Sequence, residues 1–274
     1  MAFGVFSTLS GPVLGFEDVN PLYLVGRSMI LFWWAWMNLL LLCINNQRKA
    51  EDIQEDRVNK AWRPLPSDRL TISQAEKLLW GAVPVIGLIT LCTGGFPQYV
   101  LLTALNFWYN DGGGAHNPIF RNLINACGFV LYASAAIDIV ATAPLSTYTL
   151  TIFQWLAVIG GVVLTTIQIQ DLRDQAGDSL RGRPTLPISI GDGNARWTVI
   201  VPILFWSTFP PFFWRLDVGG YGLTVLIGAF TIGRLCFLRT SEGDRTTFKI
   251  WSLWLVSIYS LPLIKMYYTR REHL

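Results

Sequence analysis

Residues 45–70 read NNQRKAEDIQEDRVNKAWRPLPSDRL, and they follow directly on an apolar segment rich in leucine and tryptophan. Four of the six positions from Glu51 to Asp56 are acidic, and six basic residues surround them. On a continuous α-helix, Asn45, Asp52 and Asp56 fall within about 40° of one another, so two carboxylates lie one turn apart. Such a pair suits Mg²⁺, which binds one or two carboxylates together with water and substrate phosphates. A solvated, charge-balanced helix end at a membrane surface is the alternative that this stretch alone leaves open.

The composition is that of a membrane protein. Of the 274 residues, 52% are hydrophobic and 14% are charged, and the mean hydropathy is +0.41. These values predict a polytopic membrane protein embedded in a lipid bilayer, and they exclude a typical soluble enzyme. The net charge is only +3, so nucleic acid is not expected as a partner. The chain has two histidines, His116 and His273, both in a predicted loop or tail, which excludes a histidine-ligated metal site.

Apolar segments alternate with short polar segments along the whole chain. Membrane spans are predicted at 1–16, 22–46, 72–92, 96–110, 118–142, 147–170, 197–214, 219–238 and 247–266. The first is too short to cross the bilayer as a straight helix, and it lacks the basic start of a signal peptide, so we interpret it as part of a first membrane helix. The loops after the second, fourth, sixth and eighth spans hold most of the lysines and arginines. These loops are therefore predicted to face the cytoplasm.

A second acidic stretch follows the sixth span. Residues 168–187 read QIQDLRDQAGDSLRGRPTLP, and on a helix Asp171 and Asp178 share a face with Asp174 beside them. Both acidic stretches end in a similar Arg-Pro-x-Pro-like pattern. The interval from Asp56 to Asp178 is 178 − 56 = 122 residues, which accommodates four helices. The spacing predicts two pseudo-symmetric helical bundles whose acidic ends face each other on one side of the membrane.

Two facing carboxylate clusters with interspersed basic residues suit one class of ligand. Mg²⁺ would bridge carboxylates to phosphate oxygens, and arginines would bind the remaining oxygens of a diphosphate. Because the adjoining cavity lies in the membrane, the rest of this ligand is expected to be apolar. An isoprenyl diphosphate satisfies both requirements.

With both stretches considered together, the sequence resembles the UbiA superfamily of intramembrane prenyl-diphosphate enzymes. The resemblance rests on Asp52-x3-Asp56 with Asn59-Lys60-x2-Arg63-Pro64-Leu65-Pro66, and on Asp171-x2-Asp174-x3-Asp178 with Gly182-Arg183-x-Thr185-Leu186-Pro187. It implies an all-α fold of about nine transmembrane helices around a central cavity, with aspartate-rich motifs on the second and sixth helices and Mg²⁺ as cofactor. Residues 1–274 are accordingly expected to form a single transmembrane domain. Its first helix looks shortened, as in an abbreviated gene product.

One departure from the family pattern concerns the first motif. The common form is Asn-Asp-x2-Asp-x3-Asp, and Arg48 and Lys49 stand here at its Asn and Asp positions. This exchange is expected to weaken metal binding and to favour direct diphosphate binding. Asn45, one turn earlier, is a candidate for the missing amide oxygen. The surrounding wording most resembles the fungal branch, which contains aromatic prenyltransferases and membrane-bound class I terpene cyclases.

The candidate site residues fall into three groups. The catalytic and metal-binding carboxylates are predicted to be Asp52, Asp56, Asp171, Asp174 and Asp178. The candidate diphosphate-binding residues are Arg48, Lys49, Lys60, Arg63, Arg121, Arg181 and Arg183. Electrostatic stabilisation of the leaving group is the chemistry that such a set provides.

The third group is predicted to line the cavity. Buried amides in membrane helices should face one another or a polar cavity, and helical spacing gives three stripes: Trp34, Asn38, Leu41 and Asn45; Gln154, Ala157, Gly161, Thr165 and Gln168; Asn106 and Asn110. Trp34, Phe107 and Tyr109 are the candidate aromatic residues beside a carbocation. For any single aromatic residue, packing or an interfacial belt is the stronger alternative.

Asp138 lies deep in the fifth predicted span. An intramembrane acid is a functional candidate, but Arg27 opens the second span at a similar depth, so a structural ion pair is an equal alternative.

The leading functional hypothesis is a membrane terpene cyclase of secondary metabolism that ionises farnesyl or geranylgeranyl diphosphate and cyclises the prenyl chain. A prenyltransferase acting on an aromatic or other acceptor is the alternative, and a non-catalytic scaffold or transporter is a third. The expected location is the endoplasmic reticulum membrane, with the aspartate-rich motifs facing the cytoplasm. No obligate protein partner is expected.

Overall fold

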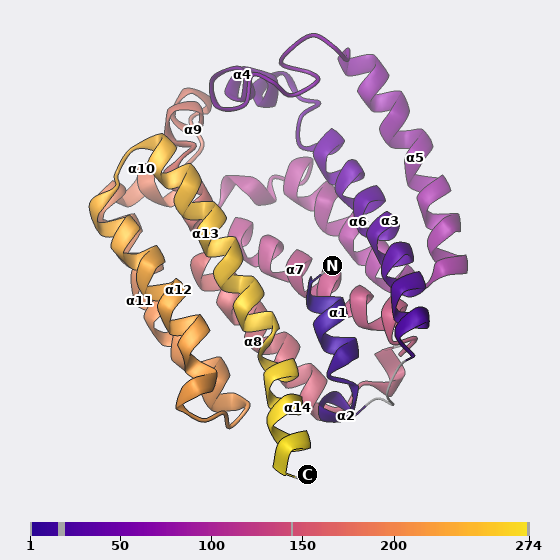
Figure 1. The fold of residues 1–274 in the computed structure, drawn as a ribbon. Coiled ribbons are helices and arrows are strands. Elements are labelled where there is room, and N and C mark those ends of the chain that lie inside the picture. The colour runs from indigo at the N-terminus through magenta and orange to yellow at the C-terminus, as the bar shows by residue number, and fades with distance from the viewer. Residues whose placement is uncertain (1, 16–19, 144, 273–274) are drawn as a thin grey trace.

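The computed structural model describes residues 2–15, 20–143 and 145–272, and this part of the chain is helical without strands (Figure 1). The α-helices are α1 Ala2–Leu9, α2 Gly11–Leu14, α3 Pro21–Asn45, α4 Ala50–Asn59, α5 Ile72–Thr93, α6 Phe96–Asn110, α7 Pro118–Val140, α8 Leu150–Thr166, α9 Gln175–Arg181, α10 Leu186–Ile190, α11 Asp192–Phe213, α12 Val218–Phe237, α13 Ser241–Tyr259 and α14 Leu261–Glu272. Three 3₁₀ segments, η1 Gly114–His116, η2 Leu145–Thr147 and η3 Ile167–Leu172, connect them. The predicted all-α fold is confirmed.

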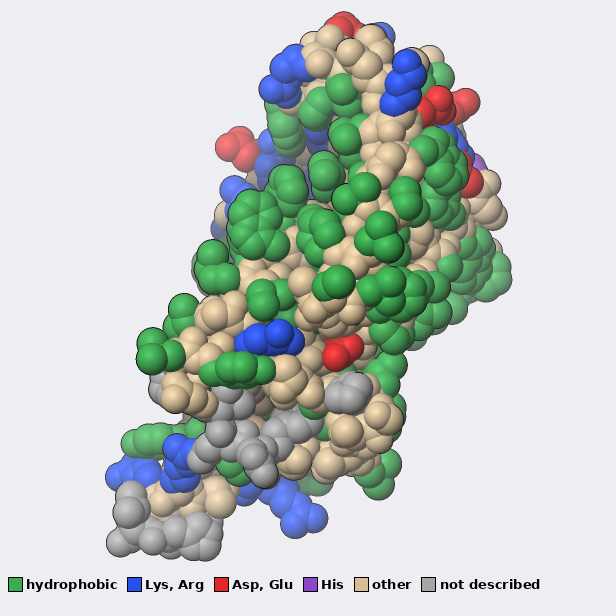
Figure 2. Space-filling model, turned by 90° about the vertical axis from the view of Figure 1, so that its right-hand side faces the viewer, with side chains coloured by type: hydrophobic (Ala, Val, Ile, Leu, Met, Phe, Trp, Pro, Cys, Tyr) green, Lys and Arg blue, Asp and Glu red, His purple; other side chains and the backbone are tan. Residues whose placement is uncertain are grey.

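Six segments within the described residues are long and apolar enough to cross a membrane, namely Leu22–Asn45, Ile72–Thr93, Pro118–Val140, Leu150–Leu172, Val218–Phe237 and Ser241–Arg271. Figure 2 shows the face over α3 and α5, where hydrophobic side chains cover the middle of the molecule and most charged side chains gather towards its two ends. This distribution is typical of a protein with a lipid-facing belt. The total of about nine membrane helices and their division into two bundles stay predictions.

The helices pack in two neighbourhoods. Helix α3 contacts α5, α6 and α7, while α11 contacts α8, α12 and α13, and the pair of α7 and α8 joins the two groups. The short α1 packs against α7 and α13, with the Phe3 ring edge-on to Tyr259 at 5.3 Å between centroids. Large buried side chains such as Trp155, Trp251 and Trp254 fill the interior around α8 and α13.

Local sequence signals explain where several helices begin. Thr71 forms a capping box with Gln74 at the start of α5, and Asn117 and Thr149 cap α7 and α8. The turn between α5 and α6 depends on Gly95, which has a φ of +75° and lies so close to Trp34 that a Cβ would be 2.9 Å from the indole nitrogen. Only glycine combines that backbone with that approach.

Both acidic stretches leave their membrane helices, which corrects the sequence prediction. Helix α3 ends at Asn45, residues 46–49 form a link, and α4 begins at Ala50. At this end the Gln47 side chain donates to the Cys43 carbonyl at 2.8 Å, satisfying a carbonyl that the ended helix leaves free. The predicted helical register from Asn45 to Asp52 was therefore wrong.

The second stretch is interrupted in the same way. Helix α8 passes into η3, which carries Asp171, and Asp178 lies on the separate helix α9. The expectation that these two aspartates share one helix face was therefore wrong as well. In Figure 1, α4 and α9 lie at the same end of the molecule. The prediction that the two acidic stretches meet is therefore confirmed, although they meet on separate short helices and not on the membrane helices themselves.

Arg27 and Asp138 each form a hydrogen bond to the backbone of another helix or its cap near the turn between α5 and α6. The Arg27 Nε donates to the Ile139 carbonyl at 2.6 Å, and an Asp138 carboxylate oxygen accepts from the Gly95 amide at 3.1 Å. Gly95 is the N-cap residue of α6, where a carboxylate is favoured by the helix dipole. This geometry supplies a structural function for Asp138.

Candidate active site

A cavity of about 660 Å³ opens between the two acidic stretches and runs into the helical bundle. Its wall comes from α1, α3, α4, α6, α7, α9 and α13 together with the links beside α4 and α9. The charged residues of this wall are Asp52, Glu55, Asp56, Lys60, Arg63, Arg121, Arg173, Asp174, Arg181 and Arg183. We call this charged end the mouth.

Ion pairs across the mouth hold α4 against the α9 region. Arg181 lies 2.5 Å from an Asp52 oxygen and 2.9 Å from a Glu55 oxygen. Arg183 lies 3.4 Å from both Glu55 and Asp178. Two carboxylates of the first stretch are thus neutralised by arginines of the second.

A second set of pairs lies beside the first. Asp56 contacts Arg63 at 2.7 Å, and Lys60 contacts Asp174 at 2.9 Å. Asn59 completes this contact, because its amide nitrogen donates to the Asp174 carbonyl at 3.1 Å. Burial raises the pKa of Asp56 and the neighbouring Arg63 opposes this effect; the pKa of Asp52 is raised for the same reason and opposed by Arg181.

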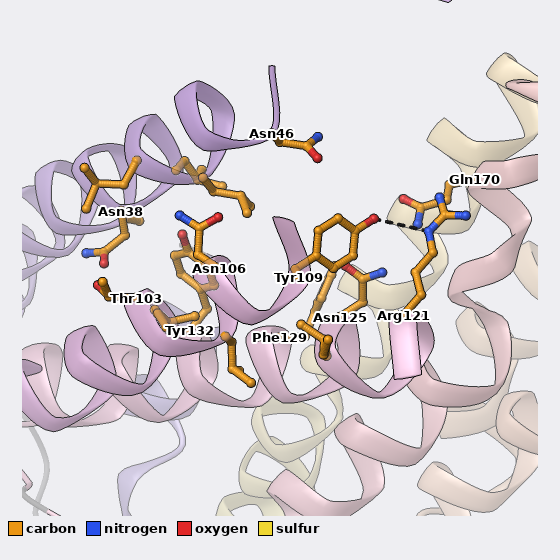
Figure 3. A pocket seen from close by; sticks show the side chains of 18 of the residues that line it. Asn38, Asn46, Thr103, Asn106, Tyr109, Arg121, Asn125, Phe129, Tyr132 and Gln170 are labelled. Carbon is orange, nitrogen blue, oxygen red and sulfur yellow. Dashed lines mark hydrogen bonds between the residues drawn. The ribbon is translucent and has the colours of Figure 1, made fainter. Parts of the chain in front are cut away.

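Asp171 and Asp178 are the most deeply placed acids of the second stretch. Asp171 pairs with Arg121 at 2.6 Å, and the same arginine donates from Nε to the Tyr109 hydroxyl at 3.2 Å (Figure 3). Asp178 is fully buried, and its Oδ2 has no hydrogen-bond partner. Burial raises the pKa of Asp178 to about 7, while the Arg121 charge favours the ionised form. The guanidinium of Arg121 also keeps one nitrogen, Nη1, without a hydrogen-bond partner.

The donor set fits a divalent cation that binds together with a ligand. Among the described residues, no three histidine, cysteine or carboxylate side chains converge closely enough to hold a metal ion by themselves. Mg²⁺ does not require such a cage, since one or two carboxylates suffice when phosphates and water complete its shell. The carboxylates of Asp52, Asp56 and Asp174 on the cavity wall provide oxygen ligands of this kind. Asp171 and Asp178 are buried beside the wall and do not line the cavity, and the Oδ2 of Asp178 lacks a hydrogen-bond partner.

Beyond the mouth, the wall is mainly apolar and aromatic; we call this part the chamber. Figure 3 shows Asn38, Asn106, Tyr109, Asn125, Phe129 and Tyr132 around it. Phe3 and Tyr259 contribute from α1 and α13. The Nδ2 atom of Asn125 is buried without a hydrogen-bond partner.

Sequence reasoning missed most of the chamber. It named Asn38, Leu41, Asn106 and Tyr109, which line the cavity, and of the α7 wall it named only Arg121. A signal was available, because Arg121, Asn125, Phe129, Tyr132 and Ala136 recur every three or four positions and all line the cavity. Following helical spacing from Arg121 would have found this stripe.

Other predicted residues lie behind the wall. Trp34 is fully buried with its ring 5.7 Å from Tyr132, and Phe107 stacks on Trp80. The Gln168 amide donates to the Thr198 carbonyl at 3.1 Å, and Thr165 accepts from the Trp206 indole at 2.9 Å. The predicted stripe thus does not line the cavity: Thr165 and Gln168 contact α11, and Gln154 and Ala157 are exposed.

The remaining candidates form a polar group beside the mouth. Asn45 and Asn110 both donate to the Asn106 side chain, at 3.3 and 2.8 Å. Arg48 and Lys49 contact Asp111, which follows α6. Arg48 and Lys49 therefore have a protein carboxylate as partner.

The fold of this chain matches that of a solved structure. A solved structure of a UbiA homologue from Archaeoglobus fulgidus bound to GPP and Mg²⁺ superposes with a TM-score of 0.59 at 12% identity, covering 95% of this chain and 94% of that one. At this identity the similarity concerns the fold alone. The sequence then specifies the family: the model of the UbiA prenyltransferase family matches residues 4–258. The chain belongs to this family.

Two curated relatives are terpene synthases. The chain is 31% identical over 183 residues to the fumagillin beta-trans-bergamotene synthase of Aspergillus fumigatus, a match that covers 64% of this chain and 60% of the synthase. It is 28% identical over 255 residues to the somaliensene A/B synthase of Streptomyces somaliensis, covering 89% of this chain and 80% of that protein.

Proposed function

We propose that this protein ionises an isoprenyl diphosphate, farnesyl or geranylgeranyl diphosphate, with Mg²⁺ and cyclises the prenyl chain as a membrane terpene cyclase. One observation carries the proposal: a single cavity joins a mouth rich in arginine and aspartate to an aromatic chamber inside the bundle. A diphosphate with a long apolar chain matches both parts. The activities of the terpene synthases among its relatives support the same reaction class.

The mouth residues would bind and stabilise the leaving diphosphate. Arg63, Arg181 and Arg183 present guanidinium groups that suit bidentate contacts with phosphate oxygens. Bound Mg²⁺, held by Asp52, Asp56, Asp171, Asp174 and Asp178, would neutralise further negative charge on the leaving group. When the arginines bind the diphosphate, the carboxylates that they contacted become available for Mg²⁺. Substrate binding would thus replace the ion pairs between arginine and aspartate with arginine–phosphate and aspartate–Mg²⁺ contacts.

The chamber would guide the carbocation that remains. Phe129, Tyr132 and Tyr259 line it, and aromatic faces attract a cation by about 1–2 kcal/mol each when water is excluded. Such a wall protects the cation from water until a chain double bond attacks it. Loss of a proton then completes the cyclisation.

A prenyltransferase is the second candidate, and the family description favours it. In that reaction an acceptor molecule, instead of a double bond of the same chain, would attack the cation. For either enzyme we propose the endoplasmic reticulum as location, with the mouth on the cytoplasmic side, because basic residues concentrate around it.

Membranes that carry the protein, incubated with Mg²⁺ and prenyl diphosphates of different length but without acceptor, test the proposal. We expect a cyclic hydrocarbon and equimolar diphosphate by gas chromatography with mass spectrometry and by a pyrophosphate assay. Diphosphate release that requires an added acceptor would replace the cyclase by the transferase. Absence of turnover with every chain length, with and without acceptors, would favour the scaffold or transporter.

Two variants test the shared chemistry. Asp52→Ala and Asp171→Ala remove one carboxylate from each acidic stretch and should abolish turnover. Asp68→Ala is the matched control, because the Asp68 side chain is 84% exposed and lies outside the cavity wall. Full activity in both site variants would disprove the metal assignment.

A further inference from the structure

The two basic residues that depart from the family pattern share the carboxylate of Asp111, and Arg48 also lies 3.6 Å from Glu76 on α5. Arg48 Nη2 lies 2.6 Å from an oxygen of Asp111, and Lys49 Nζ lies 3.5 Å from the same oxygen. Lys49 also donates to the carbonyl of Asn110, the last residue of α6. The link between α3 and α4 is thus attached to the end of α6.

The same contact continues to the wall of the cavity. Arg48 donates from Nε to the Asn45 side chain at 2.7 Å, and the Asn45 amide donates to the Asn106 side chain at 3.3 Å. Asn106 lines the cavity. Arg48 is mostly buried, with its side chain 13% exposed. This ordered geometry distinguishes it from a solvated surface cation.

Helix α4 needs external support. It has only ten residues, and its N-cap residue, Lys49, makes no side-chain cap. Isolated helices shorter than about 12–15 residues are marginal, so contacts with other elements must fix its position. Helix α9 supplies them on one side, through Arg181, which pairs with Asp52, and Gly177, whose amide donates to the Asn59 side chain, and Asp111 supplies them at the N-terminus.

We propose that Arg48, Lys49 and Asp111 form a tether that positions α4, so that Asp52 in its first turn stays at the mouth. In this role Arg48 and Lys49 are positioning residues and not diphosphate ligands. The consequence for catalysis rests on the proposed function, but the effect of the tether on the position of α4 does not depend on it. Loosening α4 should weaken binding at the mouth and leave the chamber unchanged.

The experiment compares Arg48→Met, Asp111→Asn and the double variant of the full-length protein in lipid nanodiscs. Amide hydrogen exchange of residues 50–59 reports on α4, and titration with inorganic pyrophosphate and Mg²⁺ reports on the mouth. We expect faster exchange in α4 with no change in α12, and pyrophosphate affinity lowered about five- to tenfold in each single variant. The double variant should be no worse than either single one, since coupled residues are not additive.

The direction of the Asp111→Asn effect separates the two roles. If Arg48 and Lys49 were diphosphate ligands, removing their protein carboxylate would free them and strengthen pyrophosphate binding, whereas loss of a tether weakens it. The charge exchange Arg48→Asp with Asp111→Arg should restore the protection of α4. The control is Arg57→Met on the same helix, which removes only an exposed pair with Asp68 at 3.8 Å.

Unchanged exchange in residues 50–59 of Asp111→Asn, or tighter pyrophosphate binding, would overturn the tether. A failed proposed function gives a different result, because a protein without prenyl-diphosphate turnover would still show the exchange change in α4. Normal turnover with unchanged exchange would reject the tether alone.

Discussion

The mouth and the chamber of the cavity are built in opposite ways. The mouth is formed by the short helices α4 and α9 and their links, and its charged side chains form ion pairs across the gap. The chamber is formed by α1, α3, α6, α7 and α13, and aromatic rings on its wall also pack against neighbouring side chains, such as Phe3 on Tyr259. Under the proposed function, this difference would separate two tasks: charge at the mouth would promote ionisation of the substrate, and the shape of the chamber would determine what the cation becomes.

After the loss of turnover expected in Asp52→Ala and Asp171→Ala, the next largest effect is expected from Asp178, the buried acid with an unpartnered oxygen. Asp178→Asn keeps the shape and removes the charge, and we expect diphosphate release to fall about 10²- to 10³-fold, the usual effect of losing one preorganised electrostatic group. A pyrophosphate assay and Mn²⁺ binding measured by electron paramagnetic resonance check it. Glu51→Gln is the control, because Glu51 is exposed on α4. Unchanged Mn²⁺ binding in Asp178→Asn would remove this residue from the metal site.

A second buried charge cluster tests whether location, and not charge alone, defines the mouth. Arg196 contacts Asp244 at 2.7 Å and Asp192 at 2.8 Å, and both Arg196 and Asp244 are 2% exposed in their side chains. Asp244→Asn leaves a buried cation short of one partner, so the free energy of unfolding should fall by about 3 kcal/mol. Thermal unfolding measures this. Turnover per folded molecule should not change, and a loss of turnover at full stability would extend the site to α13.

The sequence predicted the mouth better than the chamber for a physical reason. Charged residues are rare in membrane helices because placing a charge in the membrane costs free energy. Two acidic stretches with interspersed arginines therefore indicated a shared site. The break in the helix between Asn45 and Ala50 could not be predicted, because the spacing of the polar residues on its two sides also fits one continuous helix. The bond from Arg48 to Asp111, 63 residues away, holds the broken link in place.

The chamber gave a weaker signal because aromatic residues are abundant. The chain has 12 Trp and 16 Phe, so a ring beside the cavity and a ring in the core look alike in sequence. Trp34 and Phe107 were chosen from helical phase and proved to pack against other rings. Which face of a helix meets the cavity is decided by its neighbours, and Gln168 shows this by bonding to α11.

Tyr132 provides a test of the chamber with a smaller effect. Tyr132→Leu removes a π face worth about 1–2 kcal/mol to a nearby cation, so we expect diphosphate release to stay within about tenfold while the ratio of products changes. Product analysis by gas chromatography with mass spectrometry measures the ratio. Tyr132→Phe keeps the ring and should retain the original products. An unchanged product ratio in Tyr132→Leu would place the cation elsewhere in the cavity.

Asn125 lies where the mouth and the chamber meet, one helical turn from Arg121. Its Nδ2 is a buried donor without a partner, and the free Nη1 of Arg121 is a second such donor on the same face of α7. A leaving oxygen between the phosphates and the prenyl chain would accept from both. Asn125→Leu should therefore slow diphosphate release by about fivefold, the value of one neutral hydrogen bond.

The thermal stability of the Asn125→Leu variant distinguishes hydrogen bonding to the leaving oxygen from a role in packing. Replacing an unpartnered buried amide with an apolar side chain of similar size is neutral or stabilising, so the melting temperature of Asn125→Leu should stay the same or rise while turnover falls. A lower melting temperature with normal turnover would instead show that Asn125 supports the wall. If turnover falls while the melting temperature stays the same or rises, the boundary between mouth and chamber runs through α7 between Asn125 and Phe129. Asn125 is then the last group that acts on the leaving oxygen, and Phe129, one turn further, is the first ring that faces the cation.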